Sequence, residues 1–194
     1  MRHTLSIVVE NHYGELARIV GLFSARGYNI ESLTVAETLD PALSYVTLVT
    51  SGDDHTIEQI MKQVNKLVRV LYVADLTLSP HLERELVLIN VRTDSSTALH
   101  TVVSLVAENH LRVAEMLEDG LIIEATGDWI SINALVEKLV PFGIRHIVRT
   151  GPIALWKHPS DDMISLTGTP TAPMEVSATT LVSGSQPPQE GLLT

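Results

Sequence analysis

The stretch LSIVVENHYGELARIVGLFSARGYNI, residues 5–30, decides the fold of this chain. It opens with a nearly continuous apolar run, which is typical of a strand that is covered on both faces. After a short loop that contains Gly14, apolar residues recur at the helical spacing i, i+3, i+4 and i+7: Leu16, Ile19, Val20 and Phe23. Gly27 follows this pattern at the place where a left-handed C-cap favours glycine. The stretch therefore predicts a strand, a helix and the start of a second strand.

The same helical spacing recurs three more times, in segments that begin at Ile57, Leu99 and Ile132. Runs of β-forming residues lie between the helices, at 30–37, 45–50, 68–78, 85–91, 111–117, 121–125 and 144–155. The elements therefore follow the order strand, helix, strand, strand, helix, strand, twice. We predict an α+β fold of two ferredoxin-like βαββαβ domains, each an antiparallel sheet with helices on one face.

We place the first predicted domain at residues 1–79 and the second at residues 80–157. Beyond Lys157 the apolar periodicity vanishes, and Ser, Thr, Pro and Gly accumulate. A segment of that composition cannot bury enough apolar surface to become ordered on its own. We therefore expect a disordered tail over residues 158–194.

Several predicted strands are apolar at nearly every position, as in residues 6–9 and 86–89. A sheet with one wet face should alternate, so both faces of these strands are expected to be covered. Two helices can cover only one face of a four-stranded sheet. We therefore expect the other face, or the strand edges, to meet a second copy of the chain or another protein.

The composition excludes several classes of function. A formal net charge of -10 argues against nucleic-acid binding, because that affinity comes mainly from clustered Lys and Arg. The chain has no cysteine, which rules out disulfides, thiolate nucleophiles and zinc–thiolate sites. No apolar run approaches the roughly 20 residues that span a bilayer, and the strand pattern begins by Thr4. We therefore expect no membrane segment, no signal peptide and a cytoplasmic location.

No group of residues has the pattern of a catalytic centre. The eight histidines are scattered, and none forms a metal-binding helix pair or a triad motif. A glycine-rich phosphate loop is also missing. His55 beside Asp53 and Asp54 allows a metal site, but an exposed helix start with an aspartate N-cap is the favoured interpretation. We predict no catalytic and no metal-binding residue in this chain.

The junction between the first strand and the first helix is the best candidate for a binding site. Unpaired backbone N–H groups and the positive end of the helix dipole suit a carboxylate there. Gly14 lets a ligand approach the backbone, and Asn11 could add a side-chain amide. The alternative is an ordinary helix start with a turn glycine.

A second candidate lies at the start of the second strand. The Asn29 side chain offers a donor and an acceptor, which suits an amino acid. It could approach a ligand that is held near Asn11 across a subunit boundary. The alternative is that Asn29 only satisfies the backbone at a turn.

Four blocks of sequence are specific enough to indicate a family. The first half contains ENxxGxLxR at residues 10–18 and GLFSxRGYNIESLTV at residues 21–35. The second half opens with EREL at residues 83–86 and closes with PFGI and RTGPIAL within residues 141–155. Together these blocks closely resemble the regulatory subunits of acetohydroxyacid synthase, also called acetolactate synthase. The resemblance spans roughly residues 3–157.

The resemblance implies an N-terminal ACT domain that pairs with the ACT domain of a second subunit, with a C-terminal ACT-like domain behind it. The end-product amino acid would bind at the interface of this homodimer. Carried over by position, the ligand-binding residues would be Asn11, Gly14, Glu15 and Leu16 of one subunit and Asn29 and Ile30 of the other. The asparagines and loop amides would hold the charged groups, and the two apolar side chains the branched one. Valine is the expected ligand, with leucine and isoleucine left open because one methylene is worth only about 1–3 kcal/mol in an apolar pocket.

The resemblance further implies a non-catalytic regulatory subunit in branched-chain amino acid biosynthesis. It would activate a separate large catalytic subunit, which converts two pyruvates to 2-acetolactate and CO2, and confer feedback inhibition by valine. Thiamine diphosphate, magnesium and FAD are expected in that catalytic subunit, and no cofactor is expected in this chain. The equivalent loop of the second half, residues 91–96, has neither glycine nor asparagine, so we expect no amino acid there.

The alternative is a free-standing ACT-type sensor that reports an amino acid to a different partner. Such a sensor would have the same ACT fold and the same kind of ligand site as a regulatory small subunit. The RTGxxAL ending separates the two, because it resembles the small subunits and not ACT domains in general. A DNA-binding regulator is disfavoured, because no basic recognition helix is present.

Overall fold

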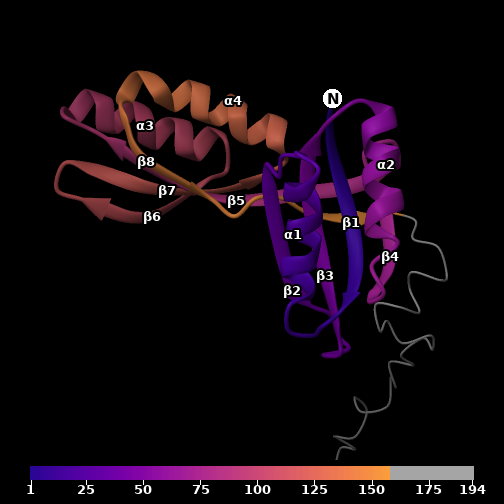
Figure 1. Ribbon diagram of the computed structural model, residues 1–194. Helices are drawn as coiled ribbons and strands as arrows, with labels where there is room; N and C mark the ends of the chain where they lie inside the picture. Colours follow the sequence, from indigo (N-terminus) through magenta and orange to yellow (C-terminus); the bar gives the residue numbers. More distant parts are fainter. Residues whose placement is uncertain (158–194) are drawn as a thin grey trace, which may run out of the picture.

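The computed structural model describes residues 1–157, which form two α+β units that follow one another along the chain (Figure 1). The first unit consists of β1 (Arg2–Glu10), α1 (Glu15–Ala25), β2 (Ser32–Glu37), β3 (Leu43–Ser51), α2 (Asp54–Val64) and β4 (Val70–Asp75). Its strands lie in the order β2-β3-β1-β4, and every pair is antiparallel. Both helices lie on the same face of this sheet.

The second unit repeats the arrangement. It consists of β5 (His81–Arg92), α3 (Ser96–Glu108), β6 (Arg112–Leu117), β7 (Gly120–Gly127), α4 (Trp129–Leu139), a 3-10 turn (Val140–Phe142), β8 (Ile144–Arg149) and β9 (Ile153–Trp156). The strand order is β6-β7-β5-β8, again antiparallel, and β9 pairs with the first residues of β5. The predicted α+β class with two ferredoxin-like domains is confirmed.

Two predicted strands end differently in the structure. The run predicted at 68–78 is a strand only over β4, because the Asp75 carboxylate accepts the Thr77 amide over 2.9 Å and turns the chain. The run predicted at 144–155 is divided into β8 and β9. Gly151, with a φ of +76°, and Pro152 interrupt it.

The helix starts follow the predicted capping chemistry. The Asp53 carboxylate accepts the Thr56 amide over 2.7 Å at the start of α2, so Asp53 is an N-cap. Asp128 does the same for Ser131 at the start of α4. Within residues 1–157 no cluster of three or more His, Asp or Glu side chains has a metal-binding arrangement.

Each unit has its own apolar core between the sheet and its helices. The first core is built on the odd-numbered positions of β1 and includes Leu5, Ile7, Ile19, Phe23, Val46, Leu48, Ile57 and Ile60. The second is built on the odd-numbered positions of β5 and includes Val87, Ile89, Val91, Val102, Leu121, Ile123, Ile132 and Leu135. These side chains are those that the periodicity of the sequence turns inward.

The helix-free face of the first sheet is covered by the chain itself. A ribbon formed by residues 81–84 of β5 and by β9 lies across it. The Tyr45 hydroxyl donates to the Ala154 carbonyl over 3.1 Å, and the Tyr72 ring meets the Trp156 ring edge-on at 5.8 Å. The two-sided burial of β1 therefore has an intramolecular cause, and it is not by itself a sign of a second copy.

The helix-free face of the second sheet is open. Leu88 and Val148 are neighbours on it, and they are 39% and 65% exposed.

No helix among residues 1–157 is long and apolar enough to cross a membrane. The tail predicted for residues 158–194 lies outside the described residues.

Candidate ligand-binding site

The loop between β1 and α1 leaves backbone amides free at an open surface. Gly14 is the N-cap of α1 with a φ of +87°, and no side chain caps this end. The Glu15 amide donates to the His12 carbonyl over 3.3 Å. Among residues 1–157 no hydrogen bond engages the amides of Leu16 and Ala17. A Cβ at Gly14 would have no neighbour within 4 Å, so a ligand can reach these two amides.

Asn11 is held at this junction by the β2–β3 hairpin. Its Nδ2 donates to Glu37 Oε1 and to the Pro41 carbonyl, each over 3.0 Å. Its own amide donates to the Ala42 carbonyl over 2.7 Å. The side chain therefore has its donors engaged, and its Oδ1 is the group left to accept a hydrogen bond from a ligand.

Glu15 is buried beneath the junction, with its side chain only 4% exposed. Its carboxylate pairs with Arg18 Nη1 at 2.9 Å and lies 3.7 Å from Arg69 Nε. The two guanidinium groups compensate a negative charge that sits at the positive end of α1. The Glu15 side chain thus stabilises the junction, while the Leu16 side chain beside it is 42% exposed.

Asn29 and Ile30 lie at the other end of α1. The Asn29 carbonyl accepts a hydrogen bond from Thr50 Oγ1 over 2.6 Å, whereas its side chain is exposed and makes no hydrogen bond among residues 1–157. Ile30 packs partly against the first core. Thr50 therefore satisfies the backbone of this turn, and the Asn29 side chain is available.

The six predicted residues form two separate groups in one chain. The group at Asn11 and Gly14 precedes α1, and the group at Asn29 and Ile30 follows it. α1 has 11 residues, which at 1.5 Å per residue is about 16 Å. A single small ligand therefore cannot contact both groups of the same chain.

Sequence reasoning did not single out the residues that hold these groups, namely Glu37, Pro41 and Thr50. They lie 20 or more positions away in the sequence and meet the site only through the β2–β3 pairing. A predicted hairpin register would have placed Thr50 beside the start of β2. It would not have shown which hydroxyl or carbonyl is used.

The corresponding loop of the second domain has a different character. Ser95 caps α3 by accepting the Ala98 amide over 3.1 Å, and Asp94 pairs with Arg92 at 2.6 Å. Asp94 and Glu118 both line the hollow of about 230 Å³ at this loop. Carboxylates there disfavour the carboxylate of an amino acid.

Comparison with known proteins identifies the family. A model described as AHAS small subunit-like ACT domain matches residues 5–72, and one described as small subunit of acetolactate synthase matches residues 84–158. An acetolactate synthase small subunit from Aquifex aeolicus is 44% identical over 154 residues, which cover 79% of this chain and 80% of that protein. The chain belongs to the acetolactate synthase small-subunit family.

Other small subunits show the same relationship. The acetolactate synthase small subunit of Mycobacterium leprae is 42% identical over 157 residues, covering 81% of this chain and 92% of that protein. The crystal structure of the acetolactate synthase small subunit from Thermotoga maritima is 34% identical and covers 82% of this chain and 99% of that one, with a TM-score of 0.73. Small-subunit family membership supports a regulatory role beside a large catalytic subunit.

Proposed function

We propose that this small subunit activates the large subunit of acetolactate synthase and inhibits it when valine binds between two copies of the first domain. The observation that carries the proposal is the placement of the two candidate groups at opposite ends of α1. The Gly14 end offers free amides, and the Asn29 end offers a free side-chain amide. Each end is half of an amino-acid site.

A twofold pair of subunits would complete both halves. In such a pair residue i of one copy meets residue j of the other, and j meets i. If α1 and β2 of two copies run antiparallel, the Gly14 end of each copy faces the Asn29 end of its partner. β2 is an edge strand whose second half is exposed, so its backbone is available for this contact. The homodimer would then hold two ligands.

The chemistry of the two ends suits a zwitterion with a branched side chain. The amides of Leu16 and Ala17 and the Asn29 amide can donate to the carboxylate. Asn11 Oδ1 can accept from the ammonium group. Leu16 and Ile30 can contact the apolar side chain, which gives preference for valine, leucine or isoleucine over polar amino acids.

Regulation would then act through the dimer. Valine can inhibit only if it binds the less active arrangement of the complex more tightly than the active one.

We assign thiamine diphosphate, magnesium and FAD to the large subunit, and we expect the complex in the cytoplasm. A free-standing sensor is disfavoured, because the relatives match across both domains and not the first alone.

Calorimetric titration of the full chain with valine, leucine and isoleucine tests the proposal. The Gly14→Asp variant should lose binding, because a carboxylate at the helix start repels the ligand carboxylate, while activation of the large subunit remains. Gly143→Asp is the matched control: Gly143 has the same φ of +87°, and a Cβ there would meet Arg92 Cβ only at an ordinary contact distance of 3.7 Å, but it lies in the second domain. Retained valine binding in the Gly14→Asp variant, or loss of binding in both variants, would exclude the proposed site.

A further inference from the structure

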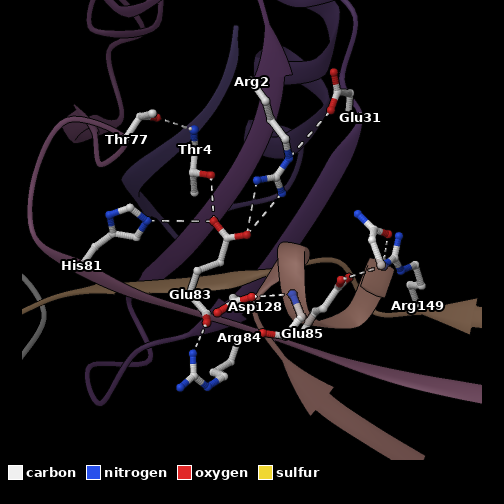
Figure 2. A network of polar contacts seen from close by, with 12 residues as sticks. Arg2, Thr4, Glu31, Thr77, His81, Glu83, Arg84, Glu85, Asp128 and Arg149 are labelled. Atoms are coloured by element: carbon white, nitrogen blue, oxygen red, sulfur yellow. Dashed lines mark hydrogen bonds and ion pairs between the residues drawn. The ribbon is translucent and has the colours of Figure 1, made fainter. Parts of the chain in front are cut away.

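A polar seam joins the two domains, and in it Arg2 of the first domain meets Glu83 of the second (Figure 2). Nη1 and Nη2 of Arg2 in β1 both donate to Glu83 Oε1 in β5, each over 3.3 Å. Its Nε lies 3.9 Å from Glu31 Oε2, and its guanidinium carbon lies 5.4 Å from the centre of the Trp129 ring. One side chain of the first domain thus contacts a strand and a helix of the second.

Glu83 is a fixed partner for Arg2. Its Oε2 accepts a hydrogen bond from Thr4 Oγ1 over 3.1 Å, and His81 Nε2 lies 4.0 Å away. The Glu83 side chain is only 11% exposed. Removing one partner from a largely buried ion pair leaves the other charge uncompensated, so a substitution that breaks the Arg2–Glu83 contact should disturb the domain boundary more than loss of a surface pair would.

Glu31 connects the seam to the proposed valine site. It directly follows Asn29 and Ile30, and its amide donates to the Val49 carbonyl over 2.9 Å. Its carboxylate accepts a hydrogen bond from the Ser51 hydroxyl and lies beside Arg2. A ligand that moves the Asn29 segment therefore also moves a carboxylate that shares Arg2 with Glu83.

A second contact joins the same segment to the second domain. Gly151, between β8 and β9, lies so close to Ser32 that a Cβ at Gly151 would overlap the Ser32 hydroxyl. Thr34 Oγ1 donates to the Thr150 carbonyl over 3.4 Å. The start of β2 is therefore in contact with the turn that leads from β8 into β9.

A cleft of about 330 Å³ lies between these two contacts. Both domains line it, with Arg2, Glu31 and Ser32 on one side and Glu85, Trp129 and Arg149 on the other. The cleft is open to solvent, so the seam is not close-packed as the two cores are. The side chains of the seam can rearrange without disrupting either core.

We propose that Arg2 couples the valine site to the second domain, which deepens the function proposed above and rests on it. When valine binds to the Asn29 segment, the position of Glu31 beside Arg2 changes. This change alters the hydrogen bonds from Arg2 to Glu83 and, with them, the contact between the two domains. Arg2 is a positioning residue in this scheme and does not touch the ligand.

Hydrogen exchange of the full chain, measured by mass spectrometry with and without valine, tests this coupling. In the wild-type protein valine should slow exchange at residues 11–17 and 29–31 and change it at residues 81–84. The variants Arg2→Gln and Glu83→Gln should keep the first response and lose the second. Arg112→Gln, which removes an exposed arginine paired with Glu124 inside the second domain, is the matched control and should keep both. Arg2→Lys, which retains the charge, should restore part of the response at 81–84.

The outcomes separate this proposal from the function on which it rests. If the wild-type chain binds no branched-chain amino acid, both fail. If Arg2→Gln and Glu83→Gln bind valine and still transmit the full response to residues 81–84, the coupling role of Arg2 alone is wrong. If Arg2→Gln remains folded but binds no valine, Arg2 belongs to the ligand site itself, which also overturns the proposal. In the reconstituted complex, valine should still bind Arg2→Gln but inhibit it less than wild type.

Discussion

Replacing Thr50 with valine removes a single hydroxyl and keeps the shape of the side chain. Thr50 is fully buried, and its hydroxyl holds the Asn29 carbonyl over 2.6 Å. A hydrogen bond of this kind contributes about 0.5–1.5 kcal/mol net. We therefore expect Thr50→Val to lower the free energy of unfolding by about 1 kcal/mol, which urea unfolding would measure.

The same change should weaken valine binding. Without the Thr50 hydroxyl, the turn at Asn29 is no longer fixed in the free protein, and valine must order it on binding. If the whole of about 1 kcal/mol is lost from binding, the dissociation constant rises about fivefold, since about 1.4 kcal/mol corresponds to tenfold. Calorimetric titration of wild-type and variant chains measures this ratio.

Thr47→Val is the control for this experiment. Thr47 is a buried threonine on the same strand, on the face that the second domain covers, and it holds no residue of the proposed site. It should bind valine with wild-type affinity. If Thr50→Val loses stability but binds valine as tightly as wild type, a fixed Asn29 plays no part in recognition and the reasoning is refuted.

Two further predictions concern the cores and the seam. Phe23→Ala, which empties the centre of the first core, should cost about 3–5 kcal/mol of unfolding free energy; a loss below about 1 kcal/mol in urea unfolding would contradict the packing described. Burial raises the pKa of the Glu85 carboxyl above its ordinary 4.5, while Arg149 opposes this. Because the folded state then binds the proton more tightly than the unfolded chain, wild-type stability should fall relative to Glu85→Gln as the pH rises above about 4.5. Urea unfolding of both proteins should show that the difference between their free energies of unfolding changes with pH in this range. A difference that is independent of pH would exclude a raised pKa of Glu85.

Local features of the fold were predictable from the sequence, because they depend on neighbouring residues. The apolar spacing identified Ile19 and Phe23 on the inward face of α1, whereas Leu16, the first residue of the pattern, is exposed. Asp53 was predicted as an N-cap and is one, and Gly27 has the positive φ expected after α1. Gly14 also marked a real break, since its left-handed backbone leaves the start of α1 without a side-chain cap.

Contacts between distant segments were not predictable in the same way. The two-sided burial of β1 pointed to a second copy, but its cover comes from residues 153–156, which only the complete topology brings to this face. The side-chain amide of Asn11 was expected to donate a hydrogen bond to the carboxylate of a ligand. Its donors instead bind Glu37 and Pro41, and no local pattern reveals that pairing.

The dependence of the first sheet on β9 has a consequence for folding during synthesis. The last strand of the first domain ends at Asp75, and β9 ends at Trp156, about 80 residues later. At about 5–20 residues per second, the ribosome needs roughly 4–16 s to supply that cover. During this interval one face of the new sheet lacks the part of its cover that β9 supplies. A nascent chain that pauses after the first domain would therefore be a candidate for aggregation or for capture by a chaperone, although that domain has a complete core of its own.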